Sequence, residues 1–205
     1  MAKAKWITLF SVLLIISCLD TGQKVVGIQP YDDFDPELIS DLAAAIPEVY
    51  GFGAVVLPSR SLPSSAFIHV KSPRYRADSL LAIQRRFLPD SVDYIIGLTE
   101  KDISTTKYGK DRKPLLPLEK YEDWGVFGLG YRPGSSSVVS IYRYNNTDRA
   151  LLKSRFVKIA VHELGHNLGL PHCETPSCVM NDAAETIRTV DSVSRNLCSV
   201  CRKSI

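Results

Sequence analysis

The sequence lacks a strong charge of either sign. Its 25 basic and 22 acidic residues give a formal net charge of +3 at pH 7. Lys3 and Lys5 belong to an N-terminal segment that we expect to be removed, and without them 23 basic residues face 22 acidic ones. Because no excess of positive charge remains to attract a polyanion, we expect no nucleic-acid partner.

Long apolar runs are scarce as well, and the N-terminal one is short. Lys3 and Lys5 precede the apolar run Trp6–Ile16, which has 11 residues. A helix needs about 20 such residues to cross a bilayer. A basic start followed by a short apolar run is typical of a secretory signal, so we expect residues 1–17 to be a signal peptide.

The end of that run, Ile15-Ile16-Ser17-Cys18, resembles a bacterial lipobox, in which the cysteine becomes the lipidated first residue of the mature protein. The resemblance implies cleavage before Cys18 and attachment to a membrane through acyl chains alone. It also implies an exported bacterial lipoprotein, periplasmic or on the cell surface. The alternatives are a conventionally cleaved signal, an uncleaved anchor and a cytoplasmic location.

Repeats, low-complexity segments and nucleotide-loop spacings are absent too. Gly128, Gly130 and Gly134 miss the G-x-G-x-x-G spacing, and no helix follows them directly. A length of 205 residues with 45% hydrophobic content suits one domain with a real core. We therefore expect residues 18–205 to form a single, monomeric domain.

Short β-branched runs alternate with helical patterns in the first half of that domain. Asp35-Pro36-Glu37 has the cap, the proline and the acidic residue of a helix start, and Pro47 and Gly51 are expected to end that helix. Such alternation predicts an α/β fold with a mainly parallel, twisted sheet. The expected strands are Lys24–Gln29, Ala54–Leu57, Ala66–Val70 and Tyr94–Leu98, and a second helix is expected at Ala77–Leu88.

The following segment is less regular. Ser104–Asp123 is rich in Thr, Lys, Gly and Pro, which predicts a long surface loop. Trp124–Tyr131 and Ser137–Tyr144 flank a turn-like Arg132–Ser135 and are expected to be paired strands. His69 lies far from the other histidines in the sequence, and we assign it a solvated or hydrogen-bonded role rather than a metal-binding one.

The strongest chemical signal lies in the helical segment Asp148–Leu168, which contains His162-Glu163-Leu164-Gly165-His166. Histidines four residues apart lie on one helix face, so both rings can reach one ion while Glu163 faces a water beside it. Zinc accepts imidazole ligands and leaves one position open in hydrolases. The pentapeptide alone also occurs by chance, with its histidines as ordinary core residues.

The continuation of the motif removes that ambiguity. Gly169 allows the helix to end and the chain to turn, which delivers His172 as a third ligand. With Met180 downstream at the position of the Met-turn, this is the extended signature of metzincins. It predicts a zinc-dependent peptidase in which Glu163 takes a proton from water and passes it to the leaving amine.

Four cysteines follow within the last 33 residues: Cys173, Cys178, Cys198 and Cys201. The run HELGHNLGLPHCETPSCVM followed by CSVC resembles the archaemetzincin family. The resemblance implies a zincin-like α+β fold around a central zinc-binding helix, with an upper subdomain at 24–169 and a small irregular lower one at 170–205. It also implies two zinc ions, a catalytic one on the histidines and a structural one on the cysteines, with Met180 beneath the catalytic site.

Several alternatives stay open at this point. The four cysteines would form two disulfides in an oxidising compartment, although the C-x-x-C pair and protection by bound metal favour zinc. The resemblance implies peptide substrates, aminopeptidase-like activity and a substrate strand antiparallel to an edge strand, either Gly125–Tyr131 or Val138–Tyr142. The rival function is a catalytically silent, surface-tethered zinc-binding module, which would have no use for the base Glu163.

Overall fold

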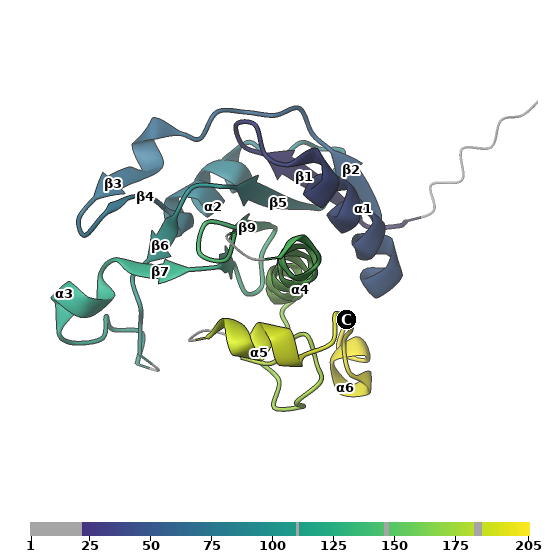
Figure 1. Cartoon of the computed structure of the whole chain (residues 1–205). Helices are drawn as coiled ribbons and strands as arrows, with labels where there is room; N and C mark the ends of the chain where they lie inside the picture. Colours follow the sequence, from purple (N-terminus) through teal and green to yellow (C-terminus); the bar gives the residue numbers. More distant parts are fainter. Residues whose placement is uncertain (1–21, 110, 146–147, 183–185) are drawn as a thin grey trace, which may run out of the picture.

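A five-stranded sheet forms the centre of the molecule (Figure 1). The computed structural model describes residues 22–109, 111–145, 148–182 and 186–205, so the expected signal peptide and Cys18 lie outside the described residues. The strands, in spatial order, are β2 (Gly53–Val56), β1 (Val25–Pro30), β5 (Tyr94–Thr99), β9 (Ser136–Ser140) and β8 (Gly128–Gly130). The first four are parallel and β8 is antiparallel, which confirms the mainly parallel sheet.

Helices cover both faces of this sheet. The helices α1 (Pro36–Tyr50) and α4 (Arg149–Asn167) lie side by side on one face (Figure 1), and α2 (Ala77–Arg86) packs on the other. Neighbouring residues of β9 point to opposite faces: Val139 joins the core under α1 and α4, and Val138 joins the core under α2. The sheet is therefore buried on both sides, as its continuous apolar strands require.

The first helix begins as predicted and ends at the predicted Gly51, but not at Pro47. The Asp35 carboxylate accepts a hydrogen bond from the Glu37 N–H at 2.9 Å, and Pro36 occupies the first turn. Pro47 lies inside the helix rather than at its end. A proline removes only one main-chain hydrogen bond, and the buried Val49 and Tyr50 keep the last turn packed despite that loss. Gly51, with a left-handed φ of 71°, terminates the helix.

A second, four-stranded sheet corrects the predicted loop and strand pair. Its strands, in order, are β3 (Phe67–His69), β4 (Pro73–Arg76), β6 (Ile103–Thr105) and β7 (Trp124–Val126). The expected strand Trp124–Tyr131 is thus split between the two sheets, with only β8 pairing with β9. The expected loop Ser104–Asp123 contains part of β6 and the short helix α3 (Leu118–Tyr121). Composition missed β6 because its partners β4 and β7 are distant in sequence.

The C-terminal segment packs beneath α4 (Figure 1). It contains α5 (Ile187–Ser192) and α6 (Ser199–Arg202), joined by irregular chain (Figure 1). Lys158 of α4 donates to the Val190 carbonyl of α5 at 3.0 Å, and Arg202 of α6 donates to the Val49 carbonyl of α1 at 2.9 Å. No helix among the described residues is both long and apolar enough to cross a membrane.

Candidate active site

Three histidines converge at the C-terminal end of α4. His162 and His166 lie one helical turn apart, with ring centroids 4.6 Å from each other. Gly169 adopts a left-handed φ of 91°, and the chain turns there to bring His172 within 5.3 Å of the first ring and 5.0 Å of the second. A nitrogen from each ring lies within 4.8 Å of the other two, so the three can ligate one ion.

Main-chain carbonyls orient the two helical histidines. The Nδ1 atom of His162 lies 2.8 Å from the Val179 carbonyl oxygen, and that of His166 lies 2.8 Å from the Leu170 carbonyl oxygen. A carbonyl oxygen can only accept a hydrogen bond, so each Nδ1 carries the ring proton. Each Nε2 is then unprotonated and can bind zinc through its lone pair. The donor set fits a zinc ion with an open fourth position.

Electrostatics favour the same protonation state. Burial lowers the pKa of His162 to about 3 and that of His166 to about 4, so both imidazoles are neutral at physiological pH. His172 is more exposed, and its Nδ1 lies 3.3 Å from a carboxylate oxygen of Asp182. Asp182 could not be predicted from the sequence, because no local spacing marks a carboxylate that orients a ligand across a loop.

Glu163 lies on α4 beneath strand β8 and is 8% exposed. Burial raises the pKa of its carboxyl to about 8, although a hydrogen bond from the Gly130 N–H opposes the shift. A Cβ at residue 128 would lie 2.6 Å from Glu163 Cγ, and a Cβ at residue 130 would lie 2.6 Å from the Glu163 carbonyl oxygen. Gly128 and Gly130 thus let the strand lie directly on the helix. The two glycines are two residues apart in the sequence and therefore share one strand face, which is the sequence feature that could have indicated this contact.

Met180 lies under the histidines and is fully buried. A Cβ on Gly165 would lie 2.4 Å from the Met180 sulfur and 3.0 Å from the Tyr50 hydroxyl oxygen. The glycine between the helical histidines therefore makes room for the methionine side chain. The Cys173 N–H also donates to the Met180 carbonyl at 2.8 Å, which ties this support to the cysteine cluster.

The four C-terminal cysteines form one cluster of free thiols. The sulfurs of Cys173 and Cys198 are 3.8 Å apart, as are those of Cys178 and Cys201. Tetrahedral thiolates about 2.3 Å from a zinc ion would be separated by about 3.8 Å, so the cluster fits a closed zinc site. The Cys201 N–H donates to the Cys198 sulfur at 3.5 Å and lowers the pKa of that thiol, which favours the thiolate form.

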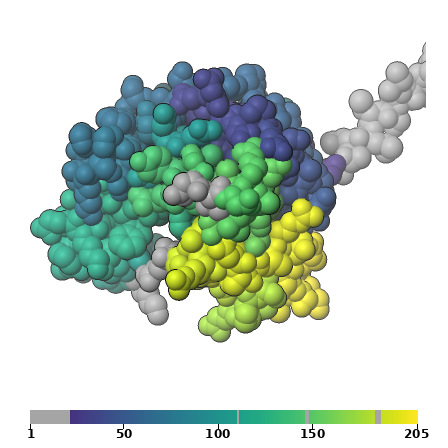
Figure 2. Space-filling view, viewed as in Figure 1, coloured from purple at the N-terminus to yellow at the C-terminus, as the bar shows by residue number. Residues whose placement is uncertain are grey.

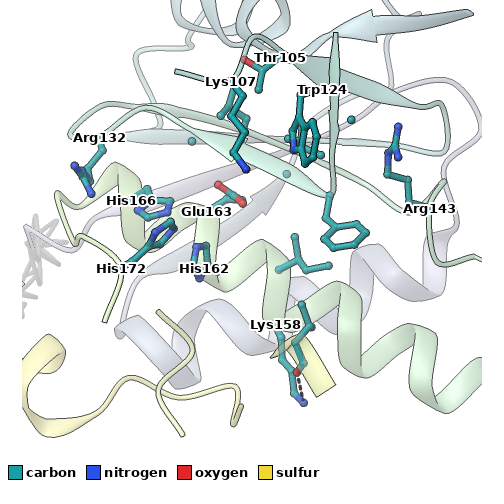
Figure 3. A pocket seen from close by; sticks show the side chains of 18 of the residues that line it. Thr105, Lys107, Trp124, Arg132, Arg143, Lys158, His162, Glu163, His166 and His172 are labelled. Carbon is teal, nitrogen blue, oxygen red and sulfur yellow. Dashed lines mark hydrogen bonds between the residues drawn. The ribbon is translucent and has the colours of Figure 1, made fainter. Parts of the chain in front are cut away.

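A cleft of about 840 Å³ lies above the histidines. It is visible in Figure 2 as a hollow between the teal and yellow segments, and its lining is shown in Figure 3. Strand β8 borders it with one edge and pairs with β9 through the other. Val138–Tyr142 was therefore wrong as an edge-strand candidate, because β9 lies between β5 and β8. Glu163 is the one carboxylate among the described lining residues, beside the cations Lys107, Arg132, Arg143 and Lys158.

A mixed β-sheet packed on a helix with this arrangement of histidines and glutamate defines a zinc metallopeptidase of the metzincin type. Residues 26–205 match the model of Peptidase family M54, and the chain belongs to that family. The archaemetzincin of Haloquadratum walsbyi is 33% identical over 188 residues, which cover 87% of this chain and 98% of that protein. These matches confirm the predicted archaemetzincin resemblance.

Two solved structures support the fold. The archaemetzincin of Methanopyrus kandleri superposes with a TM-score of 0.71 at 29% identity, covering 90% of this chain and 94% of that one. The archaemetzincin of Archaeoglobus fulgidus, solved with malonate, gives a TM-score of 0.68 at 28% identity, covering 88% of this chain and 99% of that one. The predicted mixed α/β zincin-like fold is confirmed.

Proposed function

We propose that this peptidase hydrolyses peptide bonds with Glu163 as its general base, in a cleft where His162, His166 and His172 hold zinc. The observation that carries the proposal is the placement of the Glu163 carboxylate. It lies on the helix that bears two of the histidines, buried beneath β8 and within the lining of the cleft. A purely structural metal site would have no use for a buried base at that position.

The residues of the chain divide the work of hydrolysis. A zinc ion, when bound, lowers the pKa of a coordinated water and polarises the scissile carbonyl. The Glu163 carboxylate oxygen accepts the proton of the attacking water and gives it to the nitrogen of the leaving amine. The Gly130 N–H holds that carboxylate in place. The free edge of β8 binds the peptide main chain, which gives broad selectivity for extended peptides.

Glu163→Gln tests the assignment because it keeps the shape of the side chain and removes the base. We expect unchanged zinc content and melting temperature, and a loss of kcat of about 100-fold or more on a peptide library read by mass spectrometry. Glu119→Gln, at an exposed position of α3, is the matched control and should keep full activity. Equal hydrolysis by Glu163→Gln and the unmodified protein would refute the role, and hydrolysis by neither would favour the silent binding module.

Aminopeptidase-like cleavage, which the archaemetzincin resemblance implies, stays a prediction. An aminopeptidase needs an anionic group that binds the free α-ammonium of its substrate. Glu163 is the one carboxylate among the described lining residues and is therefore the one candidate there for that role. Pairs of peptides with free and acetylated N-termini test the point. Cleavage of only the free form would support an aminopeptidase, and equal cleavage of both would support an endopeptidase.

We further infer that Cys173, Cys178, Cys198 and Cys201 hold a second, structural zinc ion. The four sulfurs lie within 4.8 Å of one another, with two of the separations at 3.8 Å, which supports this, and bound metal protects thiolates from oxidation. Metal analysis of purified protein should return two zinc ions per chain. One zinc ion, together with no free thiols after denaturation, would instead support two disulfides.

We also propose that the protein is an exported monomer tethered by lipid at Cys18. The lipobox-like sequence ending at Cys18 supports the anchor. Cys18→Ala should release the protein from the membrane fraction, and mass spectrometry of the mature N-terminus should show acylation in the unmodified protein. An unacylated N-terminus in the soluble fraction would refute the anchor, and light scattering tests the monomer.

A further inference from the structure

Arg132 lies at one end of the cleft, two residues after β8. Figure 3 shows its side chain beside His166 and His172, whereas Lys107 and Trp124 lie towards the other end. The guanidinium therefore borders the place where a scissile bond would lie, on the side of the histidines away from Trp124.

Arg132 differs from Arg143 in having no counter-ion among the described residues. The Arg143 guanidinium is held by Asp102, with a nitrogen-to-oxygen distance of 2.8 Å. Lys158 donates to the Val190 carbonyl at 3.0 Å. Arg132 forms no ion pair with any residue that the structure describes. Its guanidinium is exposed and has its donors available to an incoming anion.

The turn that carries Arg132 is fixed to the metal-binding helix. Asn167, the residue after His166, donates from Nδ2 to the Tyr131 carbonyl at 3.0 Å and to the Ser136 carbonyl at 2.8 Å. The Gly134 N–H donates in return to the Asn167 carbonyl at 3.1 Å. These bonds fix the backbone on both sides of Arg132 relative to the histidines, so its side chain starts from a defined position.

The direction of β8 indicates which part of a substrate would meet this residue. An extended peptide that pairs with the free edge of β8 does so most stably in the antiparallel sense. Its residues on the N-terminal side of the cleaved bond then lie near the C-terminal end of β8, where Arg132 follows. Its residues on the C-terminal side lie towards Trp124 and Lys107.

We propose that Arg132 binds the carboxylate of an aspartate or glutamate on the N-terminal side of the cleaved bond, and so selects acidic peptides. This inference rests on the proposed peptidase function. A guanidinium matches a carboxylate with two parallel hydrogen bonds, which a lysine ammonium cannot reproduce. The same cation repels a free α-ammonium, so an acylated or internal sequence suits this end of the cleft better than a free N-terminus.

The test uses acetylated peptides that differ only by Glu or Gln on the N-terminal side of the cleaved bond. Cleavage by the zinc-loaded protein is measured as kcat/KM, and binding to zinc-loaded Glu163→Gln is measured by fluorescence anisotropy. We expect about a tenfold preference for the Glu peptide in both measurements, the worth of one exposed charge-assisted pair. Arg132→Ala should abolish the preference, Arg132→Lys should keep part of it, and Arg132→Glu should reverse it.

Arg86→Ala is the matched control, because it removes an exposed arginine from α2 that does not line the cleft. It should leave the preference unchanged. An equal preference in Arg132→Ala and the unmodified protein, or a preference for acids only on the C-terminal side, would overturn the inference. Arg132-dependent binding without cleavage would support the inference and refute the proposed function. Cleavage with no dependence on Arg132 would support the proposed function and refute the inference.

Discussion

Gly165 allows a quantitative test of how Met180 supports the metal-binding helix. Glycine inside a helix costs about 0.5–1 kcal/mol relative to alanine, so Gly165→Ala would stabilise an unobstructed helix. Here the new methyl would lie 2.4 Å from the sulfur of Met180. That methionine is fully buried, and its carbonyl is held by the Cys173 N–H, so its backbone cannot move away freely. Overpacking of this kind costs about 1–3 kcal/mol.

The two effects have opposite signs and can be separated by a double-mutant cycle. With Met180 present, we expect Gly165→Ala to lower the free energy of unfolding by about 1–2 kcal/mol. In a Met180→Ala background the obstructing sulfur is gone, and the same substitution should raise it by up to about 1 kcal/mol. The coupling energy between the two sites is then about 2 kcal/mol, within the range measured for residues in contact.

Urea denaturation followed by circular dichroism in excess zinc measures all four proteins of the cycle. Comparable m-values would show that the unfolding transition itself is unchanged. If Gly165→Ala destabilises the protein equally in both backgrounds, the obstruction is not Met180, and the close approach to the Tyr50 hydroxyl becomes the cause to test with Tyr50→Phe.

Two further substitutions test the supports of the site. Asn167→Ala should lower the free energy of unfolding by about 2–3 kcal/mol, because the carbonyls of Tyr131 and Ser136 both lose a donor, and denaturation in urea measures the loss. Cys201→Ser should weaken zinc binding by the histidines about tenfold, because the cysteine cluster fixes the segment whose carbonyl orients His162. Competition with a chromophoric chelator measures that affinity, and an unchanged value would show that the two sites are independent.

The arrangement of the candidate catalytic residues could be predicted from the sequence because their geometry is local. His162, Glu163 and His166 share one helix, so their spacing alone determines that two rings and a carboxylate face the same space. Gly169 provides the turn to His172 within three residues. The cysteines follow the same logic in part, since a C-x-x-C pair supplies adjacent ligands.

The remaining features depend on contacts between distant segments. Strand β6 pairs with β4 and β7, and a run of three residues carries no sequence signal strong enough to show this. Asp182 orients His172 across a loop. Arg132 follows a strand in a turn-like sequence, and only the fold places it at the cleft beside His166. Each of these interactions is set by tertiary packing, which overrides local propensity.

Strand β8 contacts both Glu163 and the cleft. Its two glycines bring the backbone onto Glu163, and this contact is part of the burial that raises the pKa of that carboxyl. The strand's other edge pairs with β9, so the edge facing the cleft is the one left to a substrate. If Glu163 is the base, as proposed, a peptide bound there would exclude water from its carboxyl and raise the pKa further, whereas a zinc ion on the histidines would lower that pKa and keep the carboxylate ionised. Under the proposed function, the position of this one strand therefore affects both substrate binding and the protonation of Glu163.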